Sequence, residues 1–202
     1  MNLKRKDFLK LGGLAAVSSM AVPTILTSCA GATNSCGVVC TPSGLDHEGR
    51  LQEYLTKNGL ALPKAPNPGP FFTQIVITGN LMHVSGQGPN IDDAGNQVLG
   101  RVGDDLTLEE GRDAALHVGL TMLSVIKANF GDLNKICRIV KTLGMVNSAP
   151  DFYSSPAIIN GFSQLMVEVF GEVNGKGARS SVGVASLPSN IAVEIEAVFE
   201  LK

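Results

Sequence analysis

Two residues of opposite charge lie near the C-terminus, each within a stretch that alternates between apolar and small or polar side chains. Arg179 begins the stretch 178–185, and Glu194 lies within the stretch 193–197. Alternation with period two predicts two half-buried strands, separated at 187–190 because proline cannot donate to a ladder and Ser and Asn favour turns. If these strands pair with each other, the guanidinium and the carboxylate lie nearly opposite. The pair then predicts either a pocket for a small acid or a surface salt bridge.

The first 28 residues have the pattern of an export signal. A basic segment, 4–10, precedes an uncharged stretch, 11–26, that is rich in Leu, Ala, Val and Gly. This stretch is too short for a bilayer span and contains Pro23, so it indicates a signal peptide over 1–28 rather than a transmembrane helix. The basic segment resembles a twin-arginine signal whose second arginine is replaced by Lys6, which leaves the twin-arginine and general secretory routes open.

The end of the apolar stretch, Leu-Thr-Ser-Cys at 26–29, resembles a bacterial lipobox. Acylation of Cys29 would anchor an exported lipoprotein in the bacterial cell envelope, facing the periplasm or on the outer membrane. The alternative is an ordinary secretory signal with an incidental cysteine. Residues 29–47, rich in Gly, Ser, Thr, Pro and Ala, predict a flexible tether. Within it, Cys36 and Cys40 are placed to form a small disulfide loop in an oxidising compartment.

Composition argues against nucleic-acid and metal binding. Loss of residues 1–28 lowers the basic residues from 16 to 12 and the acidic residues from 18 to 17, so the formal charge becomes −5. An acidic chain with no Trp and 2 Tyr lacks both the basic surface and the stacking platform of a nucleic-acid binder. No second Cys/His pair lies near Cys36 and Cys40 to complete a four-ligand metal site. Cys137, in an apolar run, is expected to be a buried small hydrophobe.

The remaining elements are predicted in the order strand, strand, helix, strand, helix, strand, strand. Earlier strands are expected at 72–77, 81–85 and 136–146, and helices from Thr107, which begins a capping box, to about 129 and at 155–170. A short helix at 48–58 is expected to stop at Gly59. This order predicts one two-layer α+β domain over 48–202, with a mixed sheet and two main helices.

Several motifs, taken in order, resemble the RidA/YjgF family, which is also called endoribonuclease L-PSP and has a chorismate mutase-like fold. They are Gly69-Pro70, Gln74, Gly79-Asn80, Ser85-Gly86-Gln87, Asn160, Ala178-Arg179-Ser180, Leu187-Pro188 and Val193-Glu194-Ile195-Glu196. The resemblance covers residues 60–202. Within it, Gly103-Asp104 and 148–152 resemble a longer subgroup described as endoribonuclease or chorismate mutase-like.

The resemblance implies a homotrimer with ligand clefts between adjacent subunits. It implies hydrolysis of a reactive 2-imino or enamine acid to a 2-keto acid and ammonia, without a metal or cofactor. Arg179 would bind the substrate carboxylate, since a planar fork matches a carboxylate bidentately. Glu194 would order the attacking water and act as acid and base if burial raises its pKa. Ser85 and Gly86 would line the cleft, and Asn160 would help to position the ligand or the loop.

Two positions depart from the family pattern. Relatives of the deaminase type place a tyrosine after Gly-Pro, where this chain has Phe72 (or Phe71, since the spacing differs by one). The ring can still pack, but the hydroxyl is lost. Ser181 lies in the cleft where relatives often carry cysteine, so a thiol-dependent role is absent. Phe72 and the export signal keep one alternative open, a non-catalytic envelope protein that binds small carboxylates. A weaker alternative, an endoribonuclease, is suggested only by the family's other label.

Overall fold

The computed structural model describes residues 46–90 and 97–202. The predicted export signal, the lipidation at Cys29 and the loop between Cys36 and Cys40 lie outside these residues. Within the described ranges, no helix combines the length and the apolar character needed to cross a bilayer. Cys137 is buried as expected, and it is also disulfide-bonded.

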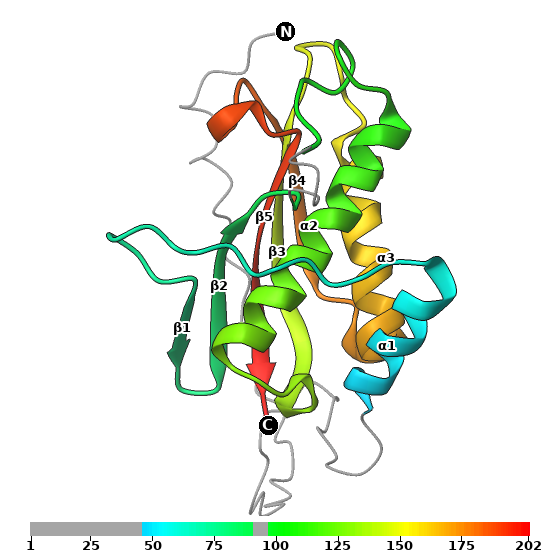
Figure 1. Cartoon of the computed structure of the whole chain (residues 1–202). Coiled ribbons are helices and arrows are strands. Elements are labelled where there is room, and N and C mark those ends of the chain that lie inside the picture. The colour runs from blue at the N-terminus through cyan, green and yellow to red at the C-terminus, as the bar shows by residue number, and fades with distance from the viewer. Residues whose placement is uncertain (1–45, 91–96) are drawn as a thin grey trace, which may run out of the picture. The chain divides into compact units, whose positions relative to one another are not determined.

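Within these described residues, five strands form one mixed sheet in the order β1-β2-β5-β3-β4 (Figure 1). Their bounds are β1 Ile75–Thr78, β2 Leu81–Gln87, β3 Ile136–Asn147, β4 Ala178–Val184 and β5 Val193–Leu201. The β3–β4 pair is parallel and the other three pairs are antiparallel. A parallel pair needs a long crossover, which a helix between β3 and β4 provides. The predicted mixed sheet and α+β class are therefore confirmed.

In the described part of the chain, three α-helices accompany the sheet: α1 His47–Asn58, α2 Leu108–Asn129 and α3 Ser155–Asn174. The predicted capping box forms at the start of α2, where Thr107 and Glu110 each accept a hydrogen bond from the other's backbone. Gly59 ends α1 in the left-handed conformation, with φ of 63°. At the start of α3, Ser154 holds the cap position, and its side chain makes no capping hydrogen bond.

The two faces of the sheet have different environments. Along β5, Val193, Ile195, Ala197 and Phe199 are buried. They lie under α2 and α3, which pack side by side on one face (Figure 1). The alternate residues, from Glu194 to Glu200, are half-buried or exposed on the opposite face, because successive side chains of a strand point to opposite sides. We call the second side the open face of the sheet.

The two C-terminal strands do not pair with each other, so the condition for Arg179 to lie opposite Glu194 is not met. β3 lies between β4 and β5 and pairs with both of them. Arg179 of β4 is opposite Thr142, and Glu194 of β5 is opposite Met145. The turn at 187–190 does form, with a short 3-10 segment at Pro188–Asn190, but it connects strands that are not neighbours. Local alternation predicts the strands but carries no information about their order in the sheet.

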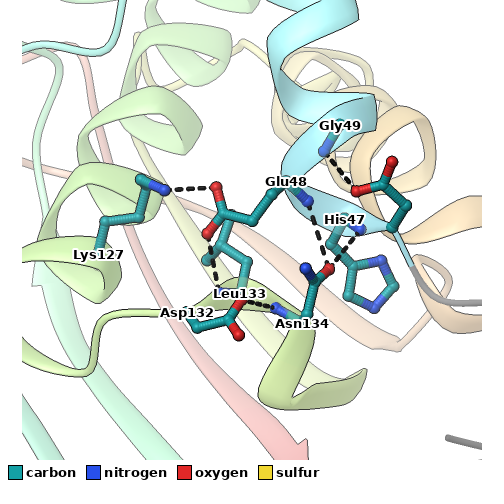
Figure 2. A network of polar contacts seen from close by, with 8 residues as sticks. His47, Glu48, Gly49, Lys127, Asp132, Leu133 and Asn134 are labelled. Atoms are coloured by element: carbon teal, nitrogen blue, oxygen red, sulfur yellow. Dashed lines mark hydrogen bonds and ion pairs between the residues drawn. The ribbon is translucent and has the colours of Figure 1, made fainter.

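Helix α1 is joined to the domain by polar contacts that the sequence did not predict (Figure 2). The side chain of Glu48 accepts a hydrogen bond from Leu133 N at 3.0 Å and pairs with Lys127 of α2. Asn134 Oδ1 accepts a hydrogen bond from His47 N at 2.7 Å. The His47 ring is buried, with its centroid 4.9 Å from that of Phe170, and burial lowers its pKa.

Candidate functional site

Arg179 lies at the start of β4, where its side chain reaches across to α3. Its Nη1 atom donates hydrogen bonds to Asn160 Oδ1 at 2.9 Å and to Ser163 Oγ at 3.0 Å. Its Nη2 atom donates a longer one to the carbonyl oxygen of Pro156 at 3.4 Å. Because Asn160 and Ser163 are three residues apart, they share one face of the helix. The structure thus brings together Arg179 and Asn160, two of the residues that the sequence singled out.

These side chains border a cleft with a volume of about 530 Å³. Ile139 and Thr142 of β3 and Phe162 and Met166 of α3 contribute to its lining, and all four are largely or fully buried. The mixture of an apolar lining with a few polar groups is typical of a small-molecule site. We refer to it below as the Arg179 cleft.

The loop between α3 and β4 positions Arg179. Regular helix geometry breaks at Gly171, where φ is 85°. A Cβ atom on Gly177 would lie 2.9 Å from the carbonyl oxygen of Ile139 and 3.0 Å from that of Val140. Only glycine avoids this contact, so Gly177 lets the chain run against β3 before β4 begins. Lys176 in this loop is paired with Glu172.

Glu194 occupies a different environment on the open face. A Cβ atom on Gly86 would lie 2.1 Å from Glu194 Oε1, so the carboxylate rests directly against this glycine. The register between β2 and β5 shifts between Val84 and Gln87, which leaves Ser85 and Gly86 in an irregular segment beside Glu194. Burial raises the pKa of Glu194, and the nearby charge of Glu196 raises it further.

Ser85 and Glu196 also line a smaller cavity of about 220 Å³ on the open face. Lys141, another lining residue, donates a hydrogen bond to Ser180 Oγ at 2.7 Å. This cavity is distinct from the Arg179 cleft, which lies on the helix-covered side. The predicted site residues therefore fall into two groups within one chain: Arg179 with Asn160, and Glu194 with Ser85 and Gly86.

The other two predicted residues, Phe72 and Ser181, line neither of these two cavities. Phe72 precedes β1, at the edge of the sheet opposite β4, and is 55% exposed. Ser181 lies two residues after Arg179, so its side chain is on the same face of β4. Its Oγ atom is buried and makes no hydrogen bond within the described part of the chain.

Sequence reasoning missed two contributors to the Arg179 cleft, Ser163 and Arg112. Ser163 could have been found from its spacing, because it follows Asn160 by three residues on a helix. Arg112 lines the cleft from α2, and its Nη2 atom donates a hydrogen bond to Gln164 Oε1 at 2.8 Å. No local signal marks Arg112, since its proximity depends on how α2 packs against α3. Over the residues described, no group of three or more His, Cys, Asp and Glu side chains is placed to hold a metal.

Comparison with known proteins places this fold in a family. Residues 52–199 match the model of the family described as "YjgF/chorismate mutase-like, putative endoribonuclease". The chain belongs to the RidA/YjgF family. The resemblance on which the expected fold was based is therefore confirmed.

Three relatives of this RidA/YjgF protein illustrate the range of the family. Protein TCP17 of Trypanosoma cruzi is 41% identical over 153 residues, which are 76% of this chain and 95% of that protein. A 2-iminobutanoate/2-iminopropanoate deaminase of Dermatophagoides farinae is 32% identical over 143 residues, 70% of this chain and 94% of the relative. The crystal structure of Atu1372 from Agrobacterium tumefaciens, a protein of unknown function, has a TM-score of 0.68 and 40% identity, covering 77% of this chain and 92% of its own.

Proposed function

We propose that this protein hydrolyses reactive 2-imino or enamine acids to 2-keto acids and ammonia. The observation that carries the proposal is the state of Arg179. Its guanidinium is oriented by the neutral side chains of Asn160 and Ser163 at the edge of a cleft. Among the described residues, no carboxylate lies within 4.0 Å of it. Its charge is therefore available to a ligand, whereas a closed salt bridge would have argued against a binding role.

The similarity to the mite deaminase supports the reaction class. That relative is named for its action on 2-iminobutanoate and 2-iminopropanoate, and it aligns with 70% of this chain. Both compounds carry a carboxylate next to the reacting carbon. A guanidinium fork that binds this carboxylate would hold the C=N group in a defined position.

In the proposed reaction, water adds to the carbon of the C=N bond. Glu194 accepts a proton from that water and gives it to the nitrogen, which forms an amino alcohol. In a second step, Glu194 takes the hydroxyl proton and delivers it to the amino group as the C–N bond breaks, which releases ammonia and leaves the 2-keto acid. A raised carboxyl pKa suits this exchange, because a group that titrates closer to the working pH transfers protons in both directions more readily. No cofactor enters these steps.

The reaction needs Arg179 and Glu194 at one substrate, and we propose that two copies of the chain supply them. The open face of the sheet bears Glu194 and exposes apolar side chains, with Val76 53% and Val182 42% exposed. Apolar surface of this kind favours association. By resemblance to the family, the assembly would be a homotrimer with clefts between adjacent subunits.

An assay of imine loss tests the proposed reaction. An amino acid oxidase generates the imine in the presence of the protein, and semicarbazide traps the imine that survives. We expect less trapped imine with the wild-type chain than with Arg179→Ala. Lys57→Ala on α1 removes a cation outside the cleft and should behave like the wild type. Equal trapping with the wild type and Arg179→Ala would rule out the deaminase proposal.

A non-catalytic carboxylate-binding protein is the second candidate. Phe72 supports it, because this position lacks the hydroxyl expected of a deaminase. In that case, keto and amino acids should raise the melting temperature through Arg179 without any turnover. A screen without stabilising ligands would count against this candidate.

An endoribonuclease is weaker still, since it is supported only by the family description and the net charge of −2 does not favour RNA binding.

We also propose that the chain is an exported lipoprotein attached through Cys29. The support is the sequence pattern of residues 1–29. Metabolic labelling with a palmitate analogue in a bacterial host should label the wild-type chain and not Cys29→Ala. Equal labelling of the two chains, or none of either, would contradict this proposal.

A further inference from the structure

We propose that the Arg179 cleft selects small acids with two anionic groups, one bound by Arg179 and the other by Arg112. This inference rests on the proposed function only in taking the Arg179 cleft as the ligand site. It adds a specificity-determining residue, Arg112, and a substrate class, the dicarboxylates.

The two arginines reach one face of α3 from different elements. Arg179 comes from β4 and donates to Asn160 Oδ1 at 2.9 Å, and Arg112 comes from α2 and donates to Gln164 Oε1 at 2.8 Å. Asn160 and Gln164 are four residues apart on α3, and such positions lie side by side with Cβ atoms about 5–6 Å apart. Both guanidinium groups border the same cleft.

The close packing of α2 against α3 fixes the position of Arg112. A Cβ atom on Gly161 would lie 2.1 Å from the carbonyl oxygen of Arg112, so the two helices approach backbone to backbone at this point. Such an approach requires a residue without a side chain. Gly161 therefore fixes the position along α3 at which Arg112 contacts Gln164 beside the cleft.

Neither arginine forms an ion pair with a carboxylate of the described residues. Within the described ranges, no Asp or Glu oxygen lies within 4.0 Å of either guanidinium. The third cation at the cleft, Lys176, is paired with Glu172. Two acidic side chains, Glu109 and Asp113, line an adjoining depression beside Arg112, and Asp113 pairs with His117 at 3.5 Å.

A ligand with two acidic groups would use both forks. The amide and hydroxyl partners of the two arginines orient the guanidinium groups but do not cancel their charge. A monocarboxylate would satisfy Arg179 and leave Arg112 bound only to Gln164 and water. The carbon chain between two carboxylates would lie along the apolar lining, to which Phe162 and Val167 contribute.

Isothermal titration of the full chain with succinate and butyrate tests this proposal, because the two acids have the same number of carbons and neither reacts. We expect the wild type to bind succinate about tenfold or more tightly than butyrate. Arg112→Gln should remove this preference while leaving butyrate affinity within about twofold. Arg112→Lys should keep part of the preference, because it retains the charge but loses the fork.

Two controls separate the possible outcomes. Arg179→Gln should weaken both acids, and Lys57→Gln on α1, which removes the same charge from a residue that does not line the cleft, should weaken neither. Equal binding of the two acids by the wild type, or an equal loss of both in Arg112→Gln, would overturn the role of Arg112 while leaving the Arg179 site intact. Absence of binding by either acid would overturn both this inference and the proposed ligand site. The melting temperatures of Arg112→Gln and Arg112→Lys without ligand are also compared, so that a folding defect in Arg112→Gln is recognised.

Discussion

Arg179 and Glu194 lie on opposite faces of the sheet. Arg179 pairs with Thr142 on β3 and Glu194 pairs with Met145, and these two partners are separated by three residues on one strand. Positions an odd number of residues apart point to opposite sides of a regular strand. Within a single chain the two groups therefore point to opposite sides of the sheet, which is why we propose that a site using both combines two chains.

Mixed assemblies should test this shared site directly. If one chain supplies Arg179 and its neighbour supplies Glu194, then Arg179→Ala and Glu194→Gln chains are each inactive alone. When equal amounts are unfolded and refolded together, they should regain about one quarter of wild-type activity. Each of the two residues is intact in half of the chains, so random mixing gives about one site in four both intact residues. The imine-loss assay measures this recovery. A double variant, Arg179→Ala with Glu194→Gln, mixed with Arg179→Ala is the control and should recover nothing. No recovery in the test mixture would contradict a shared site.

Replacement of Gly86 should reduce activity by displacing Glu194. A methyl group there would meet Glu194 Oε1 at 2.1 Å, and the flexible carboxylate side chain would have to move. Because the displaced group is a side chain rather than backbone, we expect Gly86→Ala to fold with little loss of melting temperature but to lower kcat about tenfold or more. Gly79→Ala is not a suitable control, since that turn has φ of 60°. Ser180→Ala on β4 is suitable, and a similar loss in that variant would argue against a specific effect on Glu194.

The raised pKa of Glu194 predicts a pH dependence of stability. The folded state holds this proton more tightly than the unfolded state, whose carboxyl titrates near 4.5. The free energy of unfolding therefore falls as pH rises from 4.5 through the raised pKa. Glu194→Gln should remove this loss, so its stability relative to wild type should increase over that pH window and then level off. Urea denaturation over a pH series measures this difference in stability. The control is Glu53→Gln, at an exposed position of α1. A constant difference across the series would exclude the predicted linkage.

The lowered pKa of His47 predicts the opposite pH dependence of stability. Burial lowers its pKa, and the charges of Lys202 and Arg50 lower it further, so the unfolded state takes up the proton first. Its contribution to stability is complete above 6.5 and is lost as pH falls below that value. His47→Gln should reduce the acid sensitivity of the melting temperature. His83→Gln, at an exposed position of β2, should leave that sensitivity unchanged. Identical pH profiles for wild type and His47→Gln would contradict this prediction.

Glu48 should stabilise the docked α1 mainly through its hydrogen bond to Leu133. Glu48→Ala removes that bond to a backbone amide and the ion pair with Lys127, and we expect a loss of about 1–3 kcal/mol in the free energy of unfolding. Lys127→Met removes only the ion pair, whose side chains are 36% and 31% exposed, and should cost about 0–1 kcal/mol. Chemical denaturation compares the two. A loss in Lys127→Met equal to that in Glu48→Ala would assign the effect to the ion pair instead.

Local signals in the sequence determined the individual elements and the family. The capping box at Thr107, the left-handed stop at Gly59 and the alternation in β5 depend on residues close together in the chain, which is why they could be predicted. The ordered motifs also identified the family and pointed to Arg179 and Asn160, which do meet.

Only the tertiary structure decided which residues face each other. The insertion of β3 between β4 and β5 separates Arg179 from Glu194, and the packing of α2 on α3 brings Arg112 to the Arg179 cleft. It also decided that His47 and Glu48 join α1 to residues more than 80 positions away. Strand order and helix packing result from the combined burial of many side chains rather than from any local pattern. The sequence thus determined which groups are available for chemistry, and the fold decided which of them can act together.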